Sequence, residues 1–159
     1  MSQTEGPVDI VSPVQPLIKT HSASIKTFPE DWRVTEIMGQ PWSGEGEHAY
    51  LYVEKRGMNT AQVAVWLAQQ YDVNEMNVGY SGMKDKFAVT QQWFSIHSPL
   101  DIDPAELSLV DSPHPSNALD LAENEGSYAR VLQAVRHNKK LRRGEHALNS
   151  FEITLRAIN

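Results

Sequence analysis

Short segments in which apolar and polar residues alternate recur along this chain, separated by residues typical of turns. In residues 48–54, for example, Ala49, Leu51 and Val53 alternate with tyrosines. A period of two residues is typical of a strand that packs one face on a core. We predict strands at residues 32–37, 48–54, 77–80, 92–97, 128–137 and 151–158.

One segment instead has the period of a helix. Val63, Trp66 and Leu67 are spaced at i, i+3 and i+4, which places them on one helical face. Asn59 stands just before this segment, where its side chain can cap the first turn. We therefore predict a helix over residues 60–71. Because strands outnumber helices, the expected fold class is α+β.

The domain organisation follows from where these periods are missing. A chain of 159 residues suits a single domain. Residues 1–24 show neither period, and we interpret them as a mobile N-terminal tail before a domain at 25–159. Residues 99–127 are rich in proline and acidic side chains, and we interpret them as a surface connection with one short helix from Pro104.

The charges are unevenly distributed along the chain. A formal net charge of −6 disfavours a nucleic-acid partner, because phosphate binding relies on Lys and Arg. However, residues 99–126 contain seven acidic and no basic residues, whereas residues 127–144 contain six basic and no acidic residues. This pattern fits a local basic face for nucleic acid, and equally two solvated runs of opposite charge.

The residue types exclude several classes of site. The chain has no cysteine, so disulfides and thiolate metal sites are excluded. Its histidines and acidic residues lack the spacing of a metal-binding helix, and no loop has a nucleotide-binding pattern; we predict no metal and no cofactor. With no secretory signal and no apolar run long enough to span a membrane, we expect a soluble, cytoplasmic protein.

Asp85 lies between Lys84 and Lys86 in a predicted loop, with Phe87 and Trp93 shortly after it. An aspartate in a loop commonly ends a turn by bonding its own backbone, and aromatic residues commonly belong to a core. A loop on a rigid scaffold is also where catalytic residues are placed. The residues alone name no reaction.

Residues 79–95 read GYSGMKDKFAVTQQWFS. This stretch resembles the signature of the TruD family of tRNA pseudouridine synthases, in which alanine is more common at the place of Ser81. Other segments resemble family motifs in the same order, namely 32–37, 44–48, 55–60 and 141–146, the last followed by Asn149 and Phe151.

The resemblance implies a partial pseudouridine synthase catalytic fold, a mixed, mainly antiparallel sheet with flanking helices, of which residues 25–159 are the N-terminal part. The implied substrate is a uridine in tRNA, at position thirteen of the D stem. Asp85 aligns with the catalytic aspartate, and Phe151 with the aromatic that stacks on the target base. The residues expected to bind substrate are Phe151, Asn149, Lys84, Arg142 and Arg143.

The implied reaction breaks the glycosidic N1–C1′ bond of uridine, turns the uracil and rejoins it through C5. A single carboxylate can serve as a nucleophile or as a base, and the sequence leaves both roles open for Asp85. Family members are considerably longer than this chain. We therefore expect a C-terminal half of the same enzyme as a partner, with a truncated, inactive RNA-binding fragment as the alternative; no pattern predicts an oligomeric state.

Overall fold

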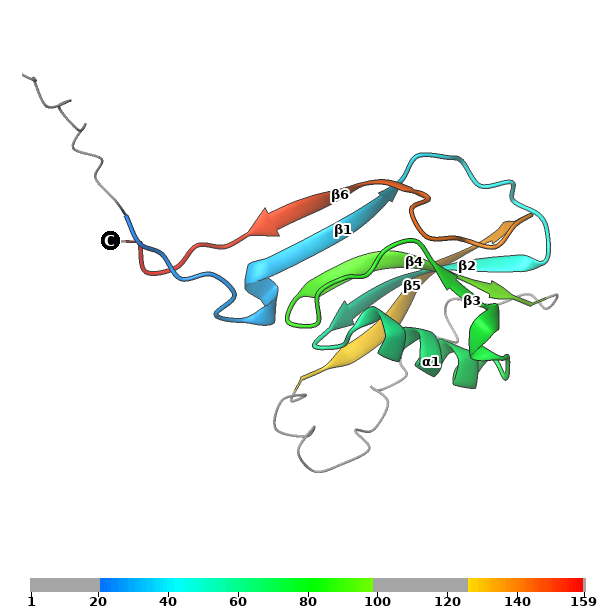
Figure 1. Cartoon of the computed structure of the whole chain (residues 1–159), viewed down its shortest axis with the longest axis horizontal. Coiled ribbons are helices and arrows are strands. Elements are labelled where there is room, and N and C mark those ends of the chain that lie inside the picture. Colours follow the sequence, from blue (N-terminus) through cyan, green and yellow to red (C-terminus); the bar gives the residue numbers. More distant parts are fainter. Residues whose placement is uncertain (1–20, 99–125, 159) are drawn as a thin grey trace, which may run out of the picture.

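The computed structural model describes residues 21–98 and 126–158 (Figure 1). These residues form a six-stranded sheet with one α-helix and two short 3-10 helices. The elements are η1 (Pro29–Asp31), β1 (Trp32–Met38), β2 (His48–Arg56), α1 (Thr60–Gln70), η2 (Glu75–Asn77), β3 (Val78–Tyr80), β4 (Val89–His97), β5 (Tyr128–His137) and β6 (His146–Ile153).

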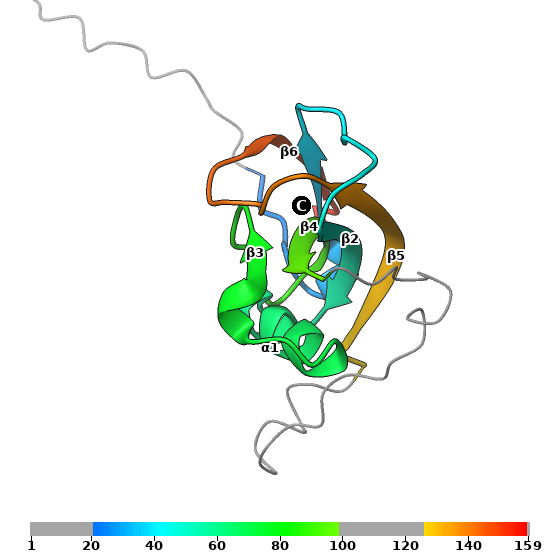
Figure 2. The ribbon, with the colours of Figure 1, turned by 90° about the vertical axis from the view of Figure 1, so that its right-hand side faces the viewer.

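The strands are ordered β5-β2-β4-β1-β6, and β3 pairs with β4 off this path. The β1–β4 pairing is parallel and every other pairing is antiparallel. The expected α+β class with a mixed, mainly antiparallel sheet is therefore confirmed. The described residues contain a single α-helix, and it lies along one face of the sheet (Figure 2).

Helix α1 begins and packs as its sequence predicts. The Asn59 side chain accepts a hydrogen bond from the backbone of Gln62, and the Gln62 side chain accepts one from the backbone of Asn59; this reciprocal cap satisfies two amide groups of the first turn. The helix buries Val63, Trp66 and Leu67. These side chains belong to the larger of two hydrophobic clusters, here called the main core, in which they join Leu51, Val53, Phe94 and Ile96 of β2 and β4.

The opposite face of β2 and β4 is also buried. Tyr50, Trp93 and Leu141 form a second cluster there, with Trp42 packed against it. The ring centroids of Trp42 and Trp93 lie 4.6 Å apart. Both faces of these central strands are covered. Along β2 the residue type therefore alternates, whereas burial alternates much less.

Strands β1 and β6 extend beyond the part of the sheet that α1 covers (Figure 1). In their antiparallel register Val34 lies opposite Phe151, and Glu36 lies opposite Asn149. Directly opposite residues share a face, and Val34 pairs with Thr90 of β4 on the same face as the core residue Phe94. Asn149 and Phe151 thus lie on the side of the sheet that carries α1, but outside its cover.

Two strand predictions are wrong by three residues or more at one bound or both. The last strand spans His146–Ile153 and not 151–158, because its partner β1 begins at Trp32, which pairs with Ile153. Beyond that point the described residues continue the pairing only as a single bridge between Arg156 and Ser24. Strand β4 begins at Val89, three residues before the predicted start. The helix predicted from Pro104 and the 99–125 part of the predicted connection lie outside the described residues.

The segment before β1 is tied to the segment after β6. Ser24 and Arg156 form a two-bond antiparallel bridge, and the Arg156 guanidinium donates two hydrogen bonds of 2.8 Å to the Asp31 carboxylate. These bonds lower the pKa of Asp31. Ser24, the last residue of the predicted tail, is therefore paired with the rest of the protein, whereas residues 1–20 of that tail lie outside the described part.

Candidate active site

Asp85 lies in the loop between β3 and β4, and its side chain is 52% exposed. The carboxylate Oδ2 accepts a hydrogen bond of 2.9 Å from Lys26 Nζ. Lys26 has φ 53°, a left-handed conformation that costs a non-glycine residue about 1–2 kcal/mol. The ties at Ser24 and Asp31 on either side hold this conformation in place.

The backbone of the Asp85 loop is anchored by two buried side chains. Thr60 Oγ1 accepts a hydrogen bond of 2.9 Å from the Lys84 amide. Lys55 Nζ donates to the carbonyl oxygens of Met58 at 2.6 Å, Asp85 at 2.9 Å and Lys84 at 3.4 Å. Burial lowers the pKa of Lys55 to about 8, although the charge of Asp85 opposes this shift. Both anchors fix where the loop presents the Asp85 carboxylate.

Lys84 forms a buried ion pair with Glu36 of β1. Its Nζ lies 2.9 Å from Glu36 Oε2, and the two side chains are 4% and 0% exposed. The other carboxylate oxygen, Glu36 Oε1, accepts a hydrogen bond from the Trp93 amide of β4. The Lys84 ammonium, which we expected to bind substrate, therefore points into the protein and joins the loop to the sheet.

Gln92 of β4 completes the support of the loop. Its side chain accepts a hydrogen bond from Thr60 Oγ1 and donates one to the Gly82 carbonyl. A Cβ on Gly82 would lie 3.0 Å from Lys84 Nζ and 3.1 Å from His146 Cε1. A larger residue at position 82 would therefore crowd the Lys84 ammonium and the His146 ring, and these side chains would have to shift by a few tenths of an ångström.

Phe151 is linked to Asp85 through two intervening side chains. The Phe151 ring meets the Trp32 ring edge-on, with centroids 6.2 Å apart. Lys26 Nζ lies 4.4 Å from the Trp32 ring centroid and donates a hydrogen bond to the Asp85 carboxylate. Phe151 itself is 56% exposed, so much of its ring is accessible on the same open part of the sheet.

Asn149 is linked to the same loop at its other end. The Ser81 hydroxyl contacts both the backbone amide and the ring of His146, and that ring lies beside the Asn149 side chain. The structure thus brings together Asp85, Lys84, Asn149 and Phe151 around one loop.

Arg142 and Arg143 lie in the turn that leads into β6. Both are exposed. The Arg143 guanidinium lies 4.3 Å from the Tyr80 ring centroid and donates to the Tyr80 hydroxyl. The Gly144 amide donates a hydrogen bond to the Ser81 carbonyl, which places this turn against the start of the Asp85 loop. The two arginines therefore present positive charge at the border of the site.

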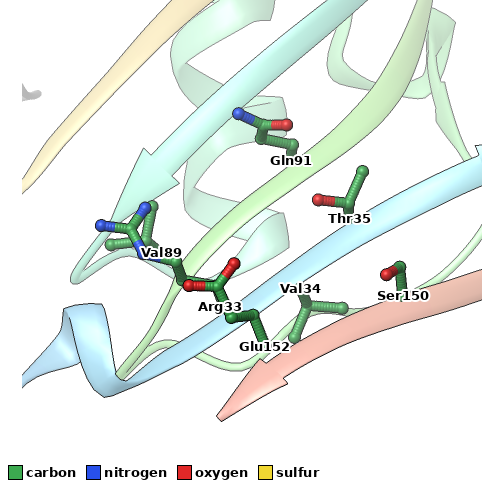
Figure 3. A pocket seen from close by; sticks show the side chains of 7 residues that line it. All are labelled: Arg33, Val34, Thr35, Val89, Gln91, Ser150 and Glu152. Carbon is green, nitrogen blue, oxygen red and sulfur yellow. The ribbon is translucent and has the colours of Figure 1, made fainter. Parts of the chain in front are cut away.

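A pocket of about 240 Å³ lies on the opposite face of the sheet (Figure 3). Its lining residues include Arg33, Thr35, Gln91 and Glu152, which alternate along their strands with the residues that face the Asp85 loop. Asp85 therefore does not line this pocket.

Three residues of the site were missed at the level of sequence. Lys26 is the second residue after the predicted tail, and no pattern distinguishes it. Glu36 and Lys55 each occupy an inward position of a strand, Lys55 continuing the series Leu51 and Val53. A charged residue at such a position signals a buried polar contact, and this signal would have found both.

The sequence from 18 to 159 matches the family model described as "tRNA pseudouridine synthase D (TruD)". The chain belongs to the TruD family. Among its relatives, tRNA pseudouridine synthase D of Pseudomonas aeruginosa (strain LESB58) is 39% identical over 153 residues, which are 96% of this chain and 39% of that protein. The protein of the same name from Cellvibrio japonicus is 44% identical over 137 residues, 86% of this chain and 37% of that protein.

A solved TruD structure shares the fold. The crystal structure of a putative tRNA pseudouridine synthase D from Methanosarcina mazei matches with a TM-score of 0.63 at 26% identity, covering 86% of this chain and 27% of that one. The chain thus spans well under half the length of the TruD proteins it matches. In the described ranges, no helix is long and apolar enough to cross a membrane.

Proposed function

We propose that Asp85 of this chain is the catalytic aspartate of a tRNA pseudouridine synthase. An enzyme of this kind isomerises uridine to pseudouridine. The observation that carries the proposal is the construction of the Asp85 loop. Its backbone is held by the buried side chains of Lys55 and Thr60, while the carboxylate stays half exposed against Lys26. A fixed backbone with an accessible carboxylate is what a catalytic group requires.

The reaction needs no reactant besides uridine. The N1–C1′ bond breaks, the uracil turns, a C5–C1′ bond forms, and the proton on C5 is lost while N1 gains one. The Asp85 carboxylate can attack as a nucleophile or remove a proton as a base. Lys26 donates a hydrogen bond to the Asp85 carboxylate, and whichever role Asp85 takes, this contact would orient the carboxylate.

The surrounding residues take the roles that their positions allow. The target base must leave its stack at a cost of a few kcal/mol, and stacking on an exposed aromatic such as Phe151 recovers about 1–3 kcal/mol of that. Asn149, two residues before it on the same face, would hydrogen-bond the base. Arg142 and Arg143, exposed at the border, would bind phosphates. To Lys84 we assign the support of the loop, because its ammonium is buried against Glu36.

The substrate proposed is a uridine at position thirteen in the D stem of tRNA, in line with the family resemblance. An alternative is that the chain binds RNA without catalysing the reaction. This alternative is favoured because the chain spans only 39% of the length of the Pseudomonas aeruginosa relative. The rest of that protein could supply part of the site.

Incubation of the chain with an unmodified tRNA transcript, followed by mapping of pseudouridine at single-nucleotide resolution, tests the proposal. We expect product at one uridine of the D stem, and none with Asp85→Asn, which keeps the size of the side chain and removes its charge. Glu75→Gln, on an exposed turn of η2, is the matched control and should leave the yield unchanged.

The outcomes separate the two candidate functions. Product from both the parent chain and Asp85→Asn would refute the role of Asp85. If the folded chain makes no product but binds the transcript, and Arg142→Ala with Arg143→Ala weakens that binding, the RNA-binding alternative holds. A chain that neither binds nor modifies the transcript contradicts both.

A further inference from the structure

The two arginines at the border of the site are held differently. The Arg143 guanidinium lies 4.3 Å from the Tyr80 ring centroid and donates a hydrogen bond of 3.1 Å to the Tyr80 hydroxyl. The Arg142 side chain is exposed, and among the described residues it makes no hydrogen bond, ion pair or ring contact. The structure therefore holds one of these two cations in place and leaves the other in solvent.

Tyr80 is itself fixed by the core. It is the last residue of β3 and lies directly opposite Phe94 of β4. Its ring is partly buried and packs against the main core, with its centroid 5.9 Å from that of Phe94. The turn that carries Arg143 is tied to the same place, because the Gly144 amide donates a hydrogen bond to the carbonyl of Ser81, the residue after Tyr80. The position of the Arg143 guanidinium is thus determined by the core.

The Arg143 guanidinium keeps donors for a ligand. A guanidinium has five N–H donors in one plane, and two donors along one edge match two oxygens of a phosphate. The Tyr80 hydroxyl takes one proton of Nη2. Whichever Nη2 proton that is, the other one still forms a two-donor edge with Nε or with Nη1. No other acceptor contacts this guanidinium within residues 21–98 and 126–158, so one edge is available.

The charges of the turn favour an anion. Residues 139–146 contain four Lys and Arg residues and one acidic residue, Glu145. The Glu145 carboxylate accepts a hydrogen bond of 2.8 Å from the Arg142 backbone amide and lies 3.8 Å from Lys139 Nζ. One carboxylate against four cations leaves the turn positively charged, and a positive surface attracts phosphate.

We propose that Tyr80 is a positioning residue, which holds the Arg143 guanidinium for bidentate contact with a backbone phosphate of the tRNA. This rests on the proposed function, in which Arg143 binds phosphate. A guanidinium that is already ordered loses less conformational freedom on binding than one that is free in solvent. Arg143 therefore contributes more to the affinity for RNA than Arg142, and it fixes the tRNA backbone beside the Asp85 loop.

Binding of the full chain to the unmodified tRNA transcript, measured at several salt concentrations, tests the role of Arg143. Arg143→Ala removes a charged hydrogen bond, so we expect the dissociation constant to rise about tenfold or more and the salt dependence to lose about one phosphate contact. Arg142→Ala should raise the dissociation constant less. Equal losses in the two variants, or a folded parent chain that does not bind the transcript, would overturn the proposal.

A double-mutant cycle tests the role of Tyr80. Tyr80→Leu removes the ring but keeps the charge of Arg143, so the dissociation constant should rise about twofold to tenfold with an unchanged salt dependence. In an Arg143→Ala chain the same substitution should cost nothing further, because Tyr80 acts through Arg143. Additive losses would show that Tyr80 only supports the fold, which contradicts the positioning role.

Two milder variants decide the matter if Tyr80→Leu does not fold. Tyr80→Phe keeps the packing against Phe94 and removes the hydroxyl, whereas Arg143→Lys keeps the charge and removes the planar fork. Both should weaken binding without changing its salt dependence, and Tyr80→Phe should have no effect in an Arg143→Ala chain. Parent affinity in Arg143→Lys would mean that charge alone matters, which contradicts a positioned fork.

Failure of the proposed function is distinguishable from failure of this inference. If the binding losses follow the expected pattern but no pseudouridine forms, the contact with phosphate stands and the enzyme proposal falls. If pseudouridine forms while the Tyr80 and Arg143 variants bind the transcript as the parent does, the enzyme proposal stands and the positioning role of Tyr80 is refuted.

Discussion

The two parts of the sheet differ in what holds them together. In the covered half, formed by β5, β2 and β4 under α1, Phe94 and Leu67 are fully buried. In the open half, formed by β1 and β6, Phe151 is 56% exposed, and the principal ties to neighbouring segments are polar, such as the Lys84–Glu36 pair. Apolar burial stabilises one half, and the candidate chemistry lies on the other, so substitutions should separate stability from activity.

The largest expected effect on stability belongs to the covered half. Phe94→Ala leaves a cavity in the main core, and such truncations cost about 3–5 kcal/mol in free energy of unfolding. Phe151→Ala, the same substitution in the open half, should cost less than about 1 kcal/mol, because its ring is already largely in water. Urea unfolding followed by circular dichroism measures both, and equal losses would show that the two halves do not differ as described.

The next effect comes from the buried ion pair that connects the two halves. Lys84→Met leaves the Glu36 carboxylate buried without its partner, which should cost about 3 kcal/mol. Adding Glu36→Gln removes the stranded charge while keeping an acceptor for the Trp93 amide, so the double variant should regain most of the loss. Should the double variant be no more stable than Lys84→Met, the charge of Glu36 is not the cause.

A smaller effect should appear as the pH falls. His48 and His137 lie opposite each other where β2 and β5 pair. Burial lowers the pKa of both rings, and the charges of His97 on His48 and of Lys139 on His137 act in the same direction. The unfolded chain, with an ordinary histidine pKa of 6.5, therefore binds more protons as the pH falls through that value, and stability is lost.

The comparison that tests this uses unfolding at a pH of about 7.5 and about 5.5, a range in which histidine side chains titrate and ordinary carboxylates do not. The parent chain should lose stability at the lower pH, and the variant with His48→Gln and His137→Gln should lose less. An identical pH dependence in both proteins would assign the effect to other groups.

The two halves also differ in how far the sequence predicts them. In the covered half, helix α1 and strands β2 and β5 follow from local periods, because apolar burial imposes those periods on the residues. In the open half, β6 begins at His146 with residues of weak strand preference, and its bounds are set by its partner β1. The fold class was therefore predictable from the sequence. Asp85 was singled out only through the family resemblance, and its catalytic role stays a prediction.

The contacts around Asp85 were not accessible, because they join segments far apart in the chain. Lys26 is 59 residues from Asp85, and Ser81 is 65 residues from His146. No local pattern reports such a meeting, which depends on how the segment before β1 and the start of β6 are placed. Charged residues at inward strand positions, such as Glu36, are the exception, since their burial demands a partner.

The smallest effect on stability should come from Lys26, whose pair with Asp85 joins the open half to the loop. Both side chains are substantially exposed, at 33% and 52%, and exposed pairs contribute about 0–1 kcal/mol. Lys26→Ala should therefore leave urea unfolding nearly unchanged. If Asp85 is the reacting group, the same substitution should nevertheless reduce pseudouridine formation strongly, with partial recovery in Lys26→Arg, which restores a cation. Lys86→Ala, next to Asp85 in sequence, is the control for a general loss of positive charge. A Lys26→Ala chain as active as the parent would mean that the pair is a surface contact, and that Asp85 is positioned by Lys55 and Thr60 of the covered half together with the Lys84–Glu36 pair.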